Sequence, residues 1–169
     1  GDVLAIGASG NDANGGDAGY VRVYNYDGAF WNQMGSDIDG DASSDQSGKS
    51  VSLSSDGSIV AIGARGFDPT GSSSGDDGNV RIYNYDGTSW NQLGQDIYGE
   101  YGGDLSGFSV SLSSNGNRIA ISAVYNDNNG SNNWHAGHVR IFDYNGNIWI
   151  QLGQDIDGVS AGEESGHSI

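Results

Sequence analysis

Loops rich in Asp and Asn are the segments of this sequence best suited to chemistry, and the chemistry they fit is cation binding. The first such loop contains Asn11, Asp12, Asn14 and Asp17 among glycines. Hard cations such as Ca²⁺ take oxygen ligands at alternating positions around a glycine turn, although this loop lacks a terminal bidentate Glu. The alternative is a polar turn in which Asn, Asp and Gly serve backbone geometry alone. The sequence leaves both interpretations open.

A second acidic loop carries Asp37, Asp39, Asp41 and Asp45. Its carboxylates could gather around one ion or act as ordinary turn residues. Related acidic loops recur later in the chain, and a catalytic pair is normally found at only one place in a structure. A recurring carboxylate is therefore better explained as structural, and we predict a protein that is not an enzyme, with Ca²⁺ as its candidate cofactor.

Three residues interrupt the repeat described below and are candidates for ligand binding: Trp134, His135 and His138. An aromatic ring beside an imidazole could contact a glycan or a protein partner, or could lie over a neighbouring sheet. A metal site made of His135 and His138 would need a third ligand. Asn129-Gly130-Ser131 fits the acceptor pattern for N-glycosylation.

Two sets of side chains recur in every copy of the repeat. Arginine next to aromatic residues can stack on a ring and pair with a recurring Asp, which would tie strands together. A recurring tryptophan could offer a sugar-stacking platform, but recurrence at one strand position favours packing between repeats. We therefore expect these tryptophans to be largely buried, and we assign structural roles to Trp31, Trp90 and Trp149 and to Arg22, Arg81 and Arg140.

The charge of the chain excludes several classes of partner. Its 169 residues include 22 acidic and 6 basic side chains, a formal net charge of −16, and Lys49 is the one lysine. Nucleic acids and anionic membrane surfaces are bound through clustered Lys and Arg, so we expect neither as a partner. The sequence has no apolar run near the roughly 18 residues of a membrane span, and no membrane insertion is expected. A strongly acidic chain suits an extracellular or cell-surface setting rich in cations.

An internal repeat determines the expected architecture. Segments with the pattern Gly-x-Val-Arg begin at Gly19, Gly78 and Gly137, at intervals of 59 residues. Within each copy, Asp-Gly or Asn-Gly pairs such as Asp56-Gly57 lie between apolar stretches. Such pairs tolerate the positive φ angles of type I′ hairpin turns. Each copy should therefore contain two hairpins, and no segment shows a helical period.

These observations predict an all-β fold made of β-propeller blades, each a four-stranded antiparallel meander. Strand sequences such as VRVY and VAIGA place apolar or small residues on both faces, as expected for sheets covered on both sides. A β-solenoid is the competing repeat fold, but its parallel strands do not fit hairpin turns. We expect a partial blade over residues 1–46, full blades over 47–105 and 106–164, and the first strand of another blade over 165–169.

Three blades are fewer than the minimum of about four that surround a propeller channel. We therefore expect either a piece of a longer propeller or array, or association between copies, of which two three-blade halves forming a six-bladed ring is the simplest case. The last residues could in principle complete the first blade.

The order Ser-Gly-x-Ser-Val, an apolar strand ending in Ile-Gly-Ala, and Gly-x-Val-Arg-Val-Tyr resembles the FG-GAP repeat of integrin α-subunit propellers and related surface proteins. Gly7-Ala8 and Gly63-Ala64 stand where that repeat has Gly-Ala, and Ser122-Ala123 is a degenerate copy. The resemblance implies a propeller fold and an extracellular setting. The calcium loop that the family carries between the first and second strands is missing, since only Ser-Asp-Gly or Ser-Asn-Gly links them here.

We therefore predict a non-enzymatic extracellular repeat module for adhesion or structural assembly, whose partners are other copies or further repeats. The alternative is a calcium-dependent, lectin-like propeller that binds a glycan or an extracellular protein through Trp134. An enzyme such as a polysaccharide lyase is disfavoured, because no single cluster of Asp or Glu with His and Tyr is evident.

Overall fold

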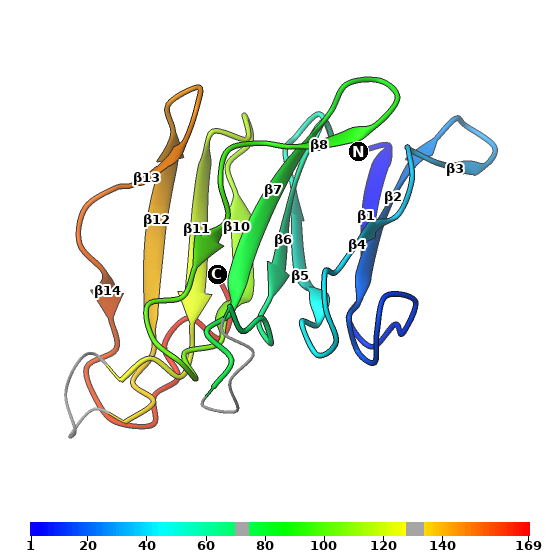
Figure 1. Cartoon of the computed structure of the whole chain (residues 1–169). Helices are drawn as coiled ribbons and strands as arrows, with labels where there is room; N and C mark the ends of the chain where they lie inside the picture. The colour runs from blue at the N-terminus through cyan, green and yellow to red at the C-terminus, as the bar shows by residue number, and fades with distance from the viewer. Residues whose placement is uncertain (70–74, 128–133) are drawn as a thin grey trace.

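The computed structural model describes residues 1–69, 75–127 and 134–169. It is an all-β structure, with 44% of the described residues in strands and none of them in helices. The strands form three antiparallel sheets that follow one another in chain order, from the blue sheet at the right of Figure 1 to the yellow and orange sheet at the left. Within the described residues, no helix has the length and apolarity of a membrane span.

Each sheet is a meander of consecutive strands. The first contains β1 (Val3–Ala8), β2 (Tyr20–Tyr26), β3 (Trp31–Gln33) and β4 (Ile38–Asp39). The second contains β5 (Ser47–Leu53), β6 (Ile59–Ala64), β7 (Asn79–Tyr85), β8 (Trp90–Gln92) and β9 (Ile97–Tyr98). The third contains β10 (Ser106–Leu112), β11 (Arg118–Ala123), β12 (His138–Tyr144), β13 (Trp149–Gln151) and β14 (Ile156–Asp157).

The outer edge of each sheet differs from the expected single fourth strand. In the second sheet two short strands pair with β7, since Trp90 lies opposite Tyr85 and Ile97 lies opposite Val80. Gly94 separates them and has a φ of +79°, a left-handed conformation that interrupts an extended strand. The meander therefore has its last strand divided at a glycine, and the full sheets contain five strands instead of four.

The turn between β5 and β6 shows how a local sequence closes a hairpin. Gly57 has a φ of +73°, whereas Asp56 does not have a positive φ, so the turn is not the expected type I′, which requires positive φ at both positions. Asp56 instead accepts hydrogen bonds from the Ser58 amide at 3.0 Å and the Ser54 hydroxyl at 2.7 Å. These bonds to the ionised carboxylate lower the pKa of Asp56 to about 2.

Two apolar layers lie between the three sheets. Val21 and Val23 of the first sheet pack with Val60 and Ile62 of the second. The second layer joins the second and third sheets and includes Val80, Ile82, Ile119, Ile121 and Trp149. Both faces of the second sheet are therefore covered, which explains its apolar residues on both sides.

Small residues allow β5 and β10, the first strands of the second and third sheets, to lie close together. The Ser50 hydroxyl donates to the Gly107 carbonyl at 2.8 Å, and the Leu112 amide donates to the Ser52 hydroxyl at 2.9 Å. A Cβ atom at Gly63 would overlap the Gly107 carbonyl oxygen. Ser and Gly at these positions are therefore required by the close approach of neighbouring sheets.

The C-terminal residues 165–169 do not form a strand and do not enter the first sheet, whose strands are β1 to β4. The Ser165 amide donates to the Ala136 carbonyl at 2.8 Å, and a Cβ atom at Gly166 would contact Ser122. This segment lies against the third sheet, as the start of β5 lies against the first. Among the described residues, the first and the third sheet thus each have one face that no other sheet covers.

Candidate functional site

The repeated tryptophans occupy matching positions, but their burial differs from the expectation. Each lies opposite a tyrosine, and the ring centroids are 5.2, 5.0 and 5.1 Å apart in the pairs Tyr26–Trp31, Tyr85–Trp90 and Tyr144–Trp149. Trp149 is only 3% exposed, Trp90 is half-buried and Trp31 is 49% exposed. The expectation of burial is wrong for Trp31, because no sheet of the described chain precedes it.

Each covered tryptophan docks into a seat on the preceding sheet. Trp90 Nε1 donates to the Met34 carbonyl at 2.8 Å, and Trp149 Nε1 donates to the Leu93 carbonyl at 2.7 Å. The glycine after each acceptor makes room for the indole: a Cβ atom at Gly94 would lie 2.8 Å from Trp149 Cδ1. We call such a carbonyl and the following glycine a tryptophan seat.

A third tryptophan seat lies on the uncovered face of the third sheet. Leu152 and Gly153 occupy the position that Leu93 and Gly94 occupy in the second sheet. No atom would lie within 4 Å of a Cβ added at Gly153, among those of the described residues outside its own chain neighbours. The chain therefore presents an uncovered tryptophan at one end and an open seat at the other.

The apolar residues around these features show the same asymmetry. Leu4 and Ile6 of β1 are exposed, whereas Val60 and Ile62 at the matching positions of β6 are buried. At the opposite end, Ile156 is 56% exposed. Its counterparts in the first and second sheets, Ile38 and Ile97, are buried. Equivalent residues are thus buried wherever a neighbouring sheet is present.

The recurring arginines form ion pairs in the first two sheets. Arg22 binds Asp37 through two nitrogens, with a shortest distance of 2.7 Å, and this contact lowers the pKa of the Asp37 carboxyl. Arg81 pairs with Asp96, in the link before β9, at 2.8 Å and with Asp41, in the link between β4 of the first sheet and β5, at 2.5 Å. Arg81 therefore holds together two sheets as well as two strands.

The two acidic loops lie side by side at one end of the first sheet. Within them, Asn14 Nδ2 donates to the Gly40 carbonyl at 3.0 Å, and the Gln46 amide donates to the Asp17 carbonyl at 3.0 Å. Asp12 accepts the Asp17 amide at 2.9 Å, as in a polar turn.

The carboxylates of the second acidic loop do not gather at one point. Asp37 and Asp41 bind arginines, while buried Asp45 accepts the amides of Asp41 and Ala42 at 3.2 and 2.9 Å. Asp39 is exposed, and Asn11 accepts the nearby Ala13 amide at 2.9 Å. Calcium binding by the two loops stays a prediction.

The structure divides the three repeat-breaking residues between two places. His135 stacks on Tyr125 with centroids 4.1 Å apart, and Trp134 stacks on His135 at 3.7 Å. Trp134, the outermost ring, is 64% exposed. This column of three rings is a surface feature, whereas His138 is buried at the start of β12. The candidate acceptor Asn129 lies outside the described residues.

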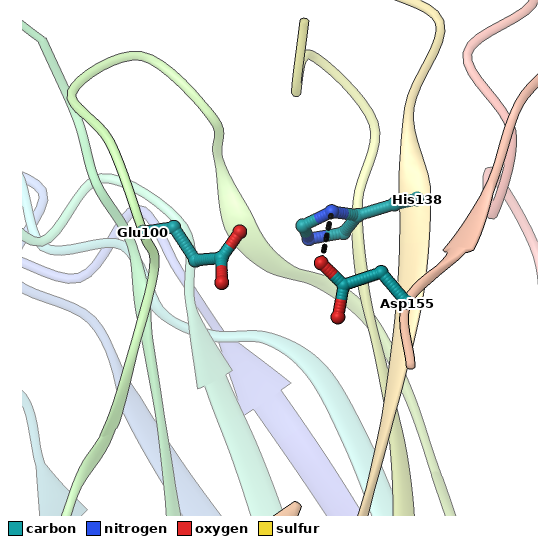
Figure 2. Close-up of side chains that lie close together, drawn as sticks. All are labelled: Glu100, His138 and Asp155. Atoms are coloured by element: carbon teal, nitrogen blue, oxygen red, sulfur yellow. Dashed lines mark ion pairs between the residues drawn. The ribbon is translucent and has the colours of Figure 1, made fainter. Parts of the chain in front are cut away.

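His138 forms a mixed cluster with Glu100 and Asp155 at the junction between the second and third sheets (Figure 2). His138 is the first residue of β12 in the third sheet, and Asp155 lies in the link just before β14. Glu100 reaches across to them from the link after β9. One ligand atom from each side chain lies within 4.8 Å of the others. In the described part of the chain, no other group of three His, Asp or Glu side chains is this close.

The electrostatics of the cluster follow from burial and from Arg140. His138 is 1% exposed, and burial together with the Arg140 charge lowers its pKa, so the imidazole is neutral at pH 7. Burial raises the pKa of Glu100. Nδ1 of His138 lies 3.7 Å from Asp155 Oδ2, while the buried Nε2 has no hydrogen-bond partner among the described residues. A neutral imidazole beside two carboxylates can accept a cation or a proton.

The corresponding position at the preceding junction is occupied differently. There Arg81 binds the carboxylates of Asp41 and Asp96, which correspond to Glu100 and Asp155. Asn79, which corresponds to His138, donates from Nδ2 to Asp96 at 3.2 Å. At the second junction Arg140 lies 3.7 Å from Glu100 and donates to the Tyr98 carbonyl at 2.7 Å, while its buried Nε has no partner within residues 1–69, 75–127 and 134–169. The His138 site therefore differs from its counterpart in having loose ion pairs and unsatisfied buried nitrogens.

The sequence alone does not indicate the cluster, because Glu100 lies in one of the recurring acidic loops, DIYGEYGGDLSG from Asp96, whose carboxylates are expected to be structural. The available signal was the register: Glu100 occupies the position of Asp41, and His138 occupies that of Asn79. Knowledge that Asp41 reaches the next sheet would have placed Glu100 beside His138.

Comparisons with known proteins do not identify the chain. No protein-family model matches it, and no curated protein matches it significantly. The likeness to FG-GAP repeats therefore stays a resemblance of short motifs, and the function has to be inferred from the structure.

Proposed function

We propose that the chain is a non-enzymatic assembly module, in which the open tryptophan seat of one copy receives Trp31 of a second copy. The observation that supports this most directly is the repeated docking of Trp90 and Trp149 into seats on the preceding sheet. The two uncovered ends carry the two halves of the same contact. A head-to-tail joint would extend the stack of sheets in one direction.

The sheets in this proposal are blades of a propeller or of an open array. A head-to-tail contact closes into a ring where its rotation permits and otherwise continues as a filament. Closed pairing of copies would also cover the uncovered sheets, which otherwise expose apolar side chains such as Leu4, Ile6 and Ile156. The FG-GAP resemblance implies an extracellular setting for such a module, and we propose adhesion or structural assembly as its role there.

Charge should control the strength of this association. Each copy has a formal net charge of −16, so two copies repel one another at low ionic strength. The Debye length falls from about 30 Å at 0.01 M salt to about 8 Å at 0.15 M, which screens the repulsion but leaves apolar burial intact. We therefore expect association to strengthen with added salt.

Sedimentation velocity over a range of protein and salt concentrations tests the proposal. We expect dimers or larger species whose population increases with both variables, and Trp31→Ala should shift the distribution to monomer. Trp134→Ala is the matched control, because Trp134 is also exposed but lies in the ring column rather than at a sheet end. A monomer at all concentrations, or equal effects of the two substitutions, would contradict the proposal.

The ring column supports a second candidate function, glycan binding. Tyr125, His135 and Trp134 present stacked rings, and sugars bind aromatic faces through their apolar C–H surfaces. A glycan array with and without a calcium chelator tests this function. Binding that disappears in Trp134→Ala and persists in Trp31→Ala would identify a lectin, whereas no binding on the array would leave assembly as the proposed function.

A further inference from the structure

We propose that His138, Glu100 and Asp155 form a binding site for a divalent transition-metal ion of the Zn²⁺ class, located between the second and third sheets. The proposal is independent of the assembly function, because the site lies at a junction within one chain.

The ligand set favours such an ion over calcium. Imidazole nitrogen with carboxylate oxygen suits Zn²⁺ and its first-row neighbours, whereas Ca²⁺ prefers six to eight oxygen ligands. Three protein ligands with a water molecule in the fourth position are a common arrangement for Zn²⁺. The set differs in this respect from the acidic loops, which offer only oxygens.

Burial of His138 is the observation that distinguishes this cluster from ordinary surface acids. The imidazole is 1% exposed, and its Nε2 has no hydrogen-bond partner in the part of the chain that the structure describes. A buried polar atom without a partner is costly, and native structures satisfy nearly all such atoms. Coordination would use a ring nitrogen of His138.

The geometry requires a small closure of the carboxylates. Ligand atoms 2.0–2.2 Å from a tetrahedral ion are about 3.4 Å apart, compared with up to 4.8 Å in the cluster and 3.7 Å between His138 and Asp155. Glu100 and Asp155 have partly exposed side chains and can make this adjustment. Gln151 already orients Asp155 by donating to its Oδ1 at 2.6 Å.

Arg140 is the main competitor for the cation. Its Nη1 lies 3.7 Å from Glu100, which is longer than the 2.5 Å contact between Arg81 and Asp41 at the first junction. The guanidinium is also held by the Tyr98 carbonyl. Arg140 therefore leaves Glu100 free to move toward His138, and it can donate to carboxylate oxygens that do not bind the ion.

Titration of the chain with Co²⁺ and Zn²⁺ tests the site. Co²⁺ gives visible absorption bands when nitrogen and oxygen atoms bind it in a tetrahedral site, and we expect saturation at one ion per chain and displacement by Zn²⁺. His138→Asn, which installs the residue present at position 79, should weaken binding about 100-fold or more. Glu100→Gln, at a more exposed position, should weaken it by at least 10-fold without disturbing the fold.

His167→Asn is the matched control. His167 is exposed and lies 3.6 Å from Glu164, but no third His, Asp or Glu among the described residues joins them in a metal-sized cluster. It should leave the affinity for Zn²⁺ unchanged. Zn²⁺ should also raise the melting temperature of the wild type and of His167→Asn, but not that of Glu100→Gln. Absence of stoichiometric binding, or an affinity for Zn²⁺ in His138→Asn or Glu100→Gln equal to that of the wild type, would overturn the proposal.

Discussion

Truncation of Trp149 and Trp31 to alanine should have unequal effects on stability, although both residues hold the same position in their sheets. Both stack on a tyrosine of the adjacent strand, at 5.1 and 5.2 Å. They differ in that Trp149 also packs on a preceding sheet and is 3% exposed, compared with 49% for Trp31. The comparison therefore isolates the contribution of sheet-to-sheet packing.

The magnitudes follow from burial. Removing a buried tryptophan costs about 3–5 kcal/mol of unfolding free energy, and loss of the Nε1 hydrogen bond to Leu93 adds about 1 kcal/mol. Trp31 loses only the half of its surface that faces Tyr26, so we expect about 1–2 kcal/mol for Trp31→Ala. The difference of about 3 kcal/mol is the packing of Trp149 on the second sheet.

Urea unfolding followed by far-ultraviolet circular dichroism measures both losses. The experiment is done at the lowest practical protein concentration, because association of copies would stabilise the wild type by mass action and enlarge the Trp31 effect. Growth of the Trp31→Ala deficit with protein concentration would support the head-to-tail joint. Equal losses in the two variants at low concentration would refute the packing argument, since sheet-to-sheet contact would then contribute nothing.

Three further predictions concern charged groups. Asp56→Asn should keep the turn, because Asn115 holds the same turn in the third sheet. The folded Asp56 carboxyl has a pKa of about 2, so its contribution to stability is present above the unfolded pKa and is lost as the pH falls toward 2. The substitution should therefore flatten the fall in stability between about pH 4 and pH 2. A pH–stability curve unchanged from the wild type would contradict this. Arg81→Ala should cost about 3 kcal/mol in urea unfolding, because it removes the arginine from the largely buried Asp96 carboxylate, whereas Arg22→Ala at the more exposed pair with Asp37 should cost less. Calcium added at fixed ionic strength should raise the melting temperature by binding to the acidic loops. An unchanged melting temperature would show that cations act on these loops only by screening their charge.

Much of the sheet organisation could be predicted because it depends on local sequence. Recurrence of Asp-Gly and Asn-Gly located the hairpins, and apolar residues on both strand faces indicated covered sheets. The interruption at Gly94 could not be predicted from local rules, since a glycine near the end of a strand fits a turn equally well. Its reason lies in the next sheet, where Trp149 needs the space that a Cβ atom would fill.

Burial of a repeated residue is likewise set by its neighbours rather than by its own sequence. Trp31 and Trp149 lie in nearly identical local sequences, yet one is exposed and the other is in the core. A self-comparison of the sequence treats the copies as equal, and it therefore predicts the position of each tryptophan but not its environment. The exposed copy is the informative one, because it shows where the stack of sheets is uncovered.

The His138 cluster shows the same limit for chemistry. Its ligands come from two sheets, and Glu100 precedes His138 by a full hairpin and a loop, so no spacing rule joins them. What brings them together is the junction that also joins Asp41 to Arg81. A change from Asn79 to His138 at this fixed geometry replaces a hydrogen-bond donor with a metal-binding imidazole. The repeat thus supplies a constant scaffold on which substitution in one copy creates a site that the other copies lack.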